Sequence, residues 1–291
     1  EARNGGRTLL NEWEAKEILA AYGIPVVPTL ACRTADEAAA AARQLGFPAV
    51  LKLLSHSITH KSDVGGVQLN LPDETEVRRA FATIQANLAQ RGQQQAFDGV
   101  TVQPMVRNSG FELIVGSSVD RQFGPVLLFG AGGVMVEVFQ DRALTLPPLN
   151  RALARRLMEQ TRIYQALRGI RGNKPVPLAE LESLLVRFGQ LIVDFAEIAE
   201  ADINPLRAGQ EQIVALDARI LLTPEDLPRQ AGPRLAIMPY PNQYISNFAL
   251  ADGTEIQLRP IRPEDEPLIV EFHAGHSDQT LRRRFFGLVR R

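Results

Sequence analysis

Residues 51–69 read LKLLSHSITHKSDVGGVQL, in which an apolar run with one lysine is followed by a polar loop that ends in two glycines. Lys52 lies in the apolar part, where a charged side chain is costly to bury without a partner, so its ammonium group should face an anion or water. If it faces an anion, a nucleotide phosphate is suitable, because lysine often binds phosphate as a point charge. If it faces water, it is an ordinary strand residue. This stretch alone leaves both interpretations open.

The loop that follows, SHSITHKSDVGGV, carries the second candidate group. Gly65 and Gly66 allow backbone N–H groups to approach and surround phosphate oxygens. His60 lies in the middle of the loop, and a neutral imidazole can attack phosphorus to give a phosphohistidine. The alternative for His60, and equally for His56, is a solvated loop histidine.

A second informative stretch, residues 201–218, reads ADINPLRAGQEQIVALDA. Asn204 and Asp217 lie at equal distances from the centre of the predicted turn AGQEQ. In a hairpin with a four-residue loop they face each other, with Cβ atoms about 5 Å apart. Two oxygen-bearing side chains at that spacing suit Mg²⁺. The alternative is a strand-end asparagine and a surface aspartate, and Asp202 is a weaker metal candidate.

Three predicted helix starts carry a capping box, in which Ser, Thr, Asp or Asn is followed three residues later by Glu. They are Asn11 with Glu14, Thr34 with Glu37, and Asp73 with Glu76. The first helix should cover residues 11–22 and end at Gly23, and the second should end at Gly46, because glycine suits the left-handed position after a helix. Extended runs at 26–31 and 49–54 alternate with them, which is typical of an α/β arrangement.

From residue 100 to residue 146, short apolar runs such as PVLLF and VMVEVF are separated by Gly, Asp and Pro. This pattern predicts an antiparallel sheet with hairpin-length connections. Helices should follow at 151–166 and 178–195, and strands at 198–206 and 212–222. The order predicts a mixed α+β and α/β architecture of two lobes with a cleft between them.

Composition excludes several classes of protein. The 291 residues give room for about two domains, and the net charge of −1 provides no global attraction to nucleic acid or to an anionic membrane. Cys32 is the only cysteine, so an internal disulfide is impossible and a reducing, cytoplasmic location is expected. The most apolar stretch, 123–139, is too short for a membrane span, and residues 1–10 do not resemble a signal peptide. We expect neither a nucleic-acid nor a membrane partner.

The C-terminal part is organised differently. Residues 224–241 contain five prolines, which predicts a linker or a wrapping extension. A strand at 254–260 and a helix at 263–275 should follow. One strand and one helix cannot bury a core, so this segment is expected to be the first piece of another domain. The chain also lacks an initiator Met, and we expect it to start within a longer protein.

The motifs occur in a recognisable order. They are PAVLKLLSHSITHKSDVGGVQLNL, VQPMV, ELIVG, FGPVLLFGAGGVMVEV, ADINPL and ALDARIL. In this order, residues 9–222 resemble the ATP-grasp subunit of ADP-forming acyl-CoA synthetases and, more distantly, the β subunit of succinyl-CoA synthetases. The resemblance implies an ATP-grasp fold over residues 8–223, with a nucleotide cleft between lobes at roughly 24–107 and 108–223.

The resemblance also implies roles for individual residues. Lys52 would contact nucleotide phosphates, and His60 would relay the phosphate. Asn204 and Asp217 would bind Mg²⁺. The remaining nucleotide contacts would come from the hinge residues Gln103 and Met105, from Glu112, and from the glycine turns Gly65, Gly66, Gly132 and Gly133. The implied cofactors are ATP or ADP and Mg²⁺, with CoA or acyl-CoA bound by domains outside this chain. One departure is local: relatives typically read SPDITHKSD, whereas this chain has His56 and Ser57 in place of Pro and Asp.

The stretch ADGTEIQLRPIRPEDEPLIVEFHAGHSDQTLRRRFFG resembles the opening strand and helix of a GCN5-related N-acetyltransferase domain. It implies a linker over 224–250 and a truncated start of that domain over 251–291. Fusion of the two is the layout of bacterial protein lysine acetyltransferases. The expected partners are then a nucleotide and the CoA-binding synthetase and acetyltransferase domains of the same polypeptide.

Three functions are consistent with these observations. The first is an enzyme domain that exchanges a phosphoryl group between nucleotide and a phosphohistidine during interconversion of acyl-CoA and acyl phosphate. The second is a catalytically silent module that senses nucleotide or acyl-CoA and regulates an attached lysine acetyltransferase. The third is an ATP-grasp carboxylate–amine ligase, in which His60 would have no role.

Overall fold

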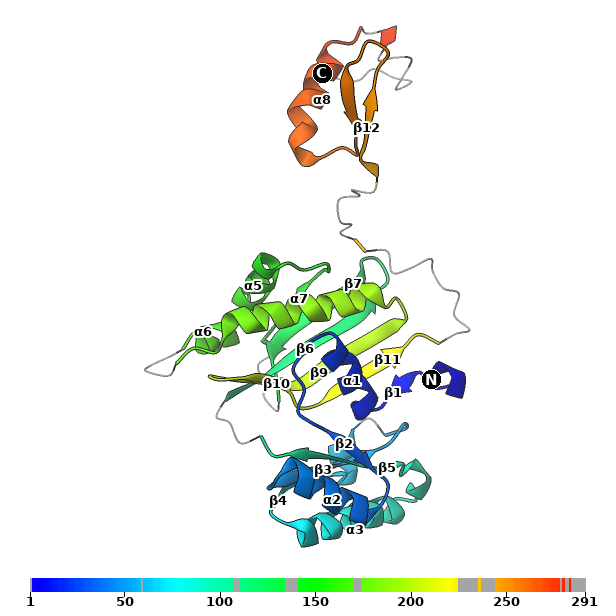
Figure 1. The fold of residues 1–291 in the computed structure, drawn as a ribbon, viewed down its shortest axis with the longest axis vertical. Helices are drawn as coiled ribbons and strands as arrows, with labels where there is room; N and C mark the ends of the chain where they lie inside the picture. The colour runs from blue at the N-terminus through cyan, green and yellow to red at the C-terminus, as the bar shows by residue number, and fades with distance from the viewer. Residues whose placement is uncertain are drawn as a thin grey trace. The chain divides into compact units, whose positions relative to one another are not determined.

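The computed structural model describes residues 2–58, 60–106, 110–133, 141–169, 174–224, 235–236, 244–277, 279–280 and 283. It divides into two compact units, Glu1–Ile237 and Met238–Arg291. The first unit contains two antiparallel sheets, each with helices and an apolar core of its own (Figure 1).

The smaller sheet has the strand order β2-β5-β3-β4, with neighbours antiparallel. Its strands are β2 (Leu30–Cys32), β5 (Gly99–Pro104), β3 (Ala49–Leu54) and β4 (Val67–Leu71). Helices α2 (Ala35–Leu45) and α3 (Glu74–Gln90) pack against it and against each other. The short 3-10 helices η2 (Lys61–Val64) and η3 (Gln94–Ala96) lie in its connections.

The larger sheet has the order β1-β11-β9-β6-β7-β8, and β10 pairs with β9. Its strands are β1 (Leu9–Leu10), β6 (Gly110–Asp120), β7 (Gly124–Ala131), β8 (Arg142–Thr145), β9 (Ile198–Gly209), β10 (Ile213–Ala215) and β11 (Ala218–Leu222). Helices α5 (Arg151–Glu159), α6 (Ile163–Leu167) and α7 (Leu178–Asp194) share its core. Helix α1 (Glu12–Ala21) follows η1 (Arg3–Gly5) and β1 and also packs on this sheet.

The predicted capping boxes at the first two helices are confirmed. Asn11 Oδ1 accepts from Glu14 N and Glu14 Oε2 accepts from Asn11 N, both at 2.9 Å. Thr34 and Glu37 make the same reciprocal pair at α2. At α3, Asp73 Oδ1 accepts from Glu76 N. These bonds satisfy N–H groups that the first turn of a helix leaves unpaired, which is why the three helices begin where the sequence places them.

Several sequence expectations were wrong. The region 100–146 is not one sheet: β5 pairs with β2 and β3 in the smaller sheet, whereas β6, β7 and β8 belong to the larger one. The strands that alternate with helices near the N-terminus pair antiparallel. The expected strand at 26–31 is reduced to β2 and an isolated bridge from Val26 to Ala215. The run VMVEVF (134–139) lies outside the described residues.

The expected helix at 151–166 is two helices, and the reason is a side-chain cap. The carboxylate of Asp141 accepts from the backbone N–H groups of Arg162 and Ile163, each at 2.6 Å. It therefore starts a second helix at Ile163, after the buried Thr161 has ended the first by donating to the Met158 carbonyl. A carboxylate supplied from a distant part of the chain leaves no pattern within 151–166 itself.

The second unit contains β12 (Ser246–Ala249), β13 (Glu255–Leu258), η5 (Pro263–Asp265) and α8 (Glu266–Ala274). The two strands form an antiparallel hairpin. The strand β12 was not expected, because it lies inside the predicted linker 224–250. Most of that linker lies outside the described residues. None of the helices that the structure describes combines the length and apolar character that crossing a bilayer requires.

Candidate functional site

Lys52 is buried in β3, a strand in which every residue is buried. Its Nζ donates to Glu12 Oε1 at 2.8 Å, to Asp217 Oδ2 at 3.0 Å and to the Leu216 carbonyl at 2.8 Å. The ammonium group therefore faces anions and not water. The alternative of a solvent-facing strand residue is wrong.

Glu12 is the centre of this charged cluster, and it was not among the residues predicted from the sequence. Its carboxylate is almost completely buried and accepts from Lys16 at 2.7 Å, from Lys52 and from Lys61. Burial alone would raise the pKa of Glu12, but the three ammonium groups outweigh it and hold the pKa well below its usual range. Burial alone would lower the pKa of Lys52, but the carboxylates of Glu12 and Asp217 outweigh burial, so the pKa of Lys52 is raised.

Lys16 connects the cluster to the predicted adenine hinge. It donates to Gln103 Oε1 at 2.8 Å and to Thr29 Oγ1 at 3.1 Å. Burial lowers the pKa of Lys16 to about 8, even though the carboxylate of Glu12 favours its charged form. Gln103 is buried at the end of β5. Two residues later Met105 is half-buried and donates its backbone N–H to the Pro48 carbonyl at 2.8 Å.

His60 is the exposed N-cap residue of η2, in a loop held to β3. Gly66 N donates to the Lys61 carbonyl at 2.8 Å, and the Gly66 carbonyl accepts from Leu53 N at 2.7 Å. A Cβ at Gly66 would lie 2.9 Å from both the Lys61 carbonyl oxygen and Leu53 Cβ, so only glycine fits there. Gly65 precedes it with φ +67°, a left-handed conformation that favours glycine.

The predicted hairpin register is confirmed. Residues 213–215 of β10 pair with 208–206 of β9, and Ala218 of β11 pairs with Ile203, so Asn204 stands opposite Asp217. Asn204 N donates to the Asp217 carbonyl at 3.3 Å. Asp202, the weaker candidate, is paired with Arg219 at 2.9 Å.

The oxygen donors of this hairpin fit a hard cation. Asn204 is exposed and the Asp217 carboxylate is partly exposed, and both bear the oxygen atoms that Mg²⁺ prefers. Among the described residues, no three His, Cys, Asp or Glu side chains gather closely enough to form a metal cluster. Two oxygen ligands are nevertheless typical of Mg²⁺ sites, in which phosphates and water complete the coordination. The metal role of this pair stays a prediction.

Glu112 and the two glycines that follow β7 extend the site. Gly132 N donates to the Glu112 carbonyl at 2.7 Å, and Gly133 N donates to Asn204 Oδ1 at 3.5 Å. Gly133 has φ +68°, and a Cβ there would lie 2.0 Å from Glu112 Oε2. The structure thus connects Lys52, Asp217, Asn204, Gly133 and Glu112 through successive contacts.

Three residues of this site were missed: Glu12, Lys16 and Lys61. A signal for the first two was present. Glu12, Ala15, Lys16 and Leu19 are the buried residues of α1, at the i, i+3, i+4, i+7 spacing of a core-facing stripe. Two opposite charges in such a stripe, four residues apart, indicate a buried ion pair.

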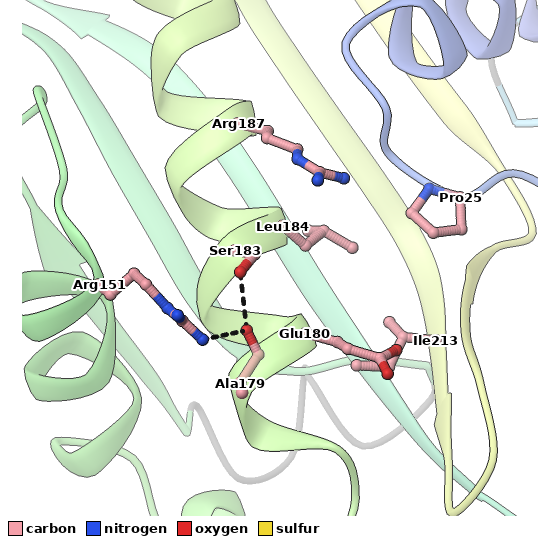
Figure 2. A pocket seen from close by; sticks show the side chains of 8 residues that line it. All are labelled: Pro25, Arg151, Ala179, Glu180, Ser183, Leu184, Arg187 and Ile213. Atoms are coloured by element: carbon pink, nitrogen blue, oxygen red, sulfur yellow. Dashed lines mark hydrogen bonds between the residues drawn. The ribbon is translucent and has the colours of Figure 1, made fainter.

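A cavity of about 400 Å³ lies elsewhere, along α7 (Figure 2). Its lining includes Arg151, Glu180 and Arg187. Both arginines already donate to backbone carbonyls, of Ala179 and Gly23 respectively. None of the predicted site residues lines this cavity, so it does not contribute to the candidate site.

Comparisons with known proteins identify the family of the chain. A family model described as the ATP-grasp domain matches residues 1–222. The acetate–CoA ligase (ADP-forming) I subunit beta of Pyrococcus furiosus is 39% identical over 73% of this chain and 91% of its own length. The acetate–CoA ligase (ADP-forming) I of Archaeoglobus fulgidus is 40% identical over 76% of this chain, but the match spans only 32% of that protein.

The solved structures include the dinucleotide forming acetyl-coenzyme A synthetase 1 of Ca. Korarchaeum cryptofilum in complex with coenzyme A, Ca-AMPCP and HgCl+. It is 41% identical and superposes with a TM-score of 0.72 over 76% of this chain and 96% of its own. A second structure of that protein, with coenzyme A and Mg-AMPPCP, has a phosphohistidine segment pointing towards the nucleotide binding site. The fold is therefore that of a known family: this chain belongs to the ATP-grasp domains, as a homologue of the β subunits of ADP-forming acyl-CoA synthetases.

Proposed function

We propose that this domain binds ATP or ADP with Mg²⁺ and exchanges a phosphoryl group between the nucleotide and His60. The observation that carries the proposal is the position of Lys52. Its ammonium group is held by Asp217, which is paired with Asn204, and by Glu12, which also holds Lys61 next to His60. A phosphate-binding lysine, two oxygen donors for a metal and a histidine loop thus share one set of contacts.

Each residue has a defined task in this proposal. Lys52 would attract and orient the phosphates by its charge, and the glycine turns Gly65, Gly66, Gly132 and Gly133 would let the backbone lie close to them, so that catalysis comes mainly from positioning. Gln103 and Met105 would hold the adenine, and Glu112 would bind the nucleotide from the larger sheet. Asn204 and Asp217 would hold Mg²⁺, which neutralises charge on the transferring phosphoryl group when bound. His60 would attack through a neutral ring nitrogen, while the bond from phosphorus to the ADP oxygen breaks.

The relatives support this reaction and suggest its setting. In the Korarchaeum protein a phosphohistidine segment points towards the nucleotide site, and the Pyrococcus relative is a subunit, beta, of an ADP-forming acetate–CoA ligase. We propose by analogy that CoA and the acyl group are bound by other domains or subunits, and that the complete reaction interconverts an acyl-CoA and its acid. This chain spans about a third of the length of the Archaeoglobus relative, so this activity would belong to the complete assembly.

A second candidate is a regulatory module attached to an acetyltransferase domain, and one observation favours it. The second unit contains β12, β13 and α8, whose apolar residues, such as Leu268, Val270 and Phe272, are exposed. We propose that the second unit belongs to a GCN5-related acetyltransferase domain, and that this domain includes β12 (Ser246–Ala249) from the expected linker 224–250 as well as residues 251–291. In that case nucleotide binding would regulate acetylation without phosphoryl transfer.

Labelling of the full-length protein with ³²P-ATP and Mg²⁺ separates the two candidates. The enzyme predicts an acid-labile, base-stable label that His60→Ala removes, and that His273→Ala, the same change in the second unit, leaves in place. Tight ATP binding without label would reject the enzyme in favour of the regulatory module.

A further inference from the structure

The first turn of α1 is joined to the His60 loop at two points. On one side, Asn11 uses its Oδ1 to cap the helix, so its Nδ2 donates to His56 Nε2 at 3.1 Å. The other ring nitrogen, Nδ1, then carries the proton and donates to Asp98 Oδ2 at 2.7 Å. On the other side of His60, Lys61 Nζ donates to Glu12 Oε2. The loop is therefore anchored before and after the histidine.

Glu12 also contacts Lys52, through its other carboxylate oxygen. One carboxylate oxygen, Oε1, accepts from Lys52 at 2.8 Å, while the other, Oε2, accepts from Lys61. A carboxylate group is rigid, so it sets the separation between the two ammonium groups. Lys52 is the proposed phosphate ligand and Lys61 follows His60 directly in sequence. A single buried side chain thus connects the phosphate-binding group to the loop that carries the nucleophile.

We propose that Glu12 is a positioning residue, which places His60 relative to the phosphate held by Lys52. This inference rests on the proposed phosphoryl transfer to His60. Glu12 itself does not touch the reacting atoms, because both of its oxygen atoms are occupied by lysines. Its effect on the reaction passes through Lys61 and the backbone of η2, whose N-cap residue is His60.

A purely stabilising role explains the cluster less well. Buried ion pairs often stabilise a fold no better than apolar residues of similar volume, because desolvation offsets the attraction. Here one carboxylate is buried with three ammonium groups, of which Lys52 and Lys61 also approach Asp217. Accurate positioning of His60 relative to the phosphate explains this buried cluster better than a gain in stability does. Displacement of a reacting group by about 1 Å can slow a reaction by about 100-fold.

The test uses the full-length protein with Glu12→Gln, Lys61→Met and the double variant. Glu17→Gln is the matched control, because it is the same change on the exposed side of the same helix. We expect Glu12→Gln and Lys61→Met each to slow labelling of His60 by about 100-fold, while Glu17→Gln stays within about twofold. The dissociation constant of ATP should change by less than about fivefold, because Lys52 keeps Asp217 and the Leu216 carbonyl. The double variant should be about as slow as either single variant, since both break one link.

Hydrogen exchange provides a readout that does not depend on phosphoryl transfer. Amides of residues 56–66 should exchange faster in Glu12→Gln than in Glu17→Gln, while β9 and β11 stay unchanged and show that the domain is folded. Unchanged exchange in 56–66, or multiplicative rate losses in the double variant, would overturn the role of Glu12. If the wild-type protein acquires no label, the proposed function fails, and exchange of 56–66 still decides whether Glu12 holds the loop. If Glu12→Gln does not fold, Lys61→Met removes the same contact at a partly exposed loop residue. Both the labelling rate of His60 and the hydrogen exchange of residues 56–66 are then measured on Lys61→Met.

Discussion

Lys52 carries a charge inside a strand that is otherwise apolar, and its neighbours make that possible. We expect Lys52→Met to lower the free energy of unfolding by about 3 kcal/mol, because the carboxylate of Glu12 stays buried with one partner fewer. Urea unfolding measures this change. Lys174→Met is the matched control on an exposed residue and should stay within about 0.5 kcal/mol. Equal losses in the two variants would contradict the buried network.

Lys16 makes stability depend on pH in an unusual direction. Burial lowers its pKa to about 8, whereas the unfolded chain keeps a lysine pKa near 10.4. Between these values the unfolded state binds more protons, so the free energy of unfolding rises with pH. The pKa of Lys52 is raised, so Lys52 lowers the free energy of unfolding as the pH rises. This decrease begins only above the pH range in which Lys16 acts. From about pH 7.5 to about pH 9.5 the wild type should gain about 2 kcal/mol relative to Lys16→Met. A flat difference between the two proteins would show that Lys16 titrates normally.

The residue scale also shows what the sequence could and could not predict. Lys52 and His60 could be proposed because their chemistry is visible in one stretch of chain. Glu12 and Lys16 belong to the buried stripe of a helix. The role of a charged residue in such a stripe can be inferred only when its partners are known. The partners of Glu12 are 4, 40 and 49 residues away. Contacts at that separation come from packing of the whole domain, which local spacing does not encode.

At the scale of elements, helix starts and one hairpin were predictable because their determinants are local. The capping boxes and the register of Asn204 against Asp217 follow from residues close together in sequence. Assignment of strands to sheets was not predictable in the same way. Alternation of apolar residues identifies β5 as a strand, but its neighbours β2 and β3 are chosen by tertiary packing.

The same hairpin contains the predicted Mg²⁺ ligands. We expect Asp217→Asn and Asn204→Ala each to weaken Mg²⁺-dependent nucleotide binding by about tenfold, because each removes an oxygen ligand or its charge. Calorimetry with and without Mg²⁺ measures this change. Asp202→Asn is the control on the same strand, since Arg219 already neutralises Asp202, and it should bind normally. Equal Mg²⁺ dependence in all three variants and the wild type would show that the hairpin does not hold the ion.

At the scale of the whole molecule, the two compact units differ in how they bury apolar residues. The first has two cores, one for each sheet. In the second, the described residues of β12 and α8 include none that is buried. Burial of apolar surface is the main source of folding stability. The free energy of unfolding should therefore reside in the first unit.

This difference predicts the result of dividing the chain between residues 237 and 238. The fragment 1–237 should unfold cooperatively within about 2 °C of the full chain, because it retains both cores and every contact of the Lys52 cluster. The fragment 238–291 should show no cooperative transition, since a hairpin and one helix without buried residues cannot exclude water from a core. Calorimetry of the two fragments and the full chain tests both statements. A cooperative transition in 238–291 would show that its exposed apolar residues find a core of their own, and a large loss in 1–237 would show that the second unit supports the first.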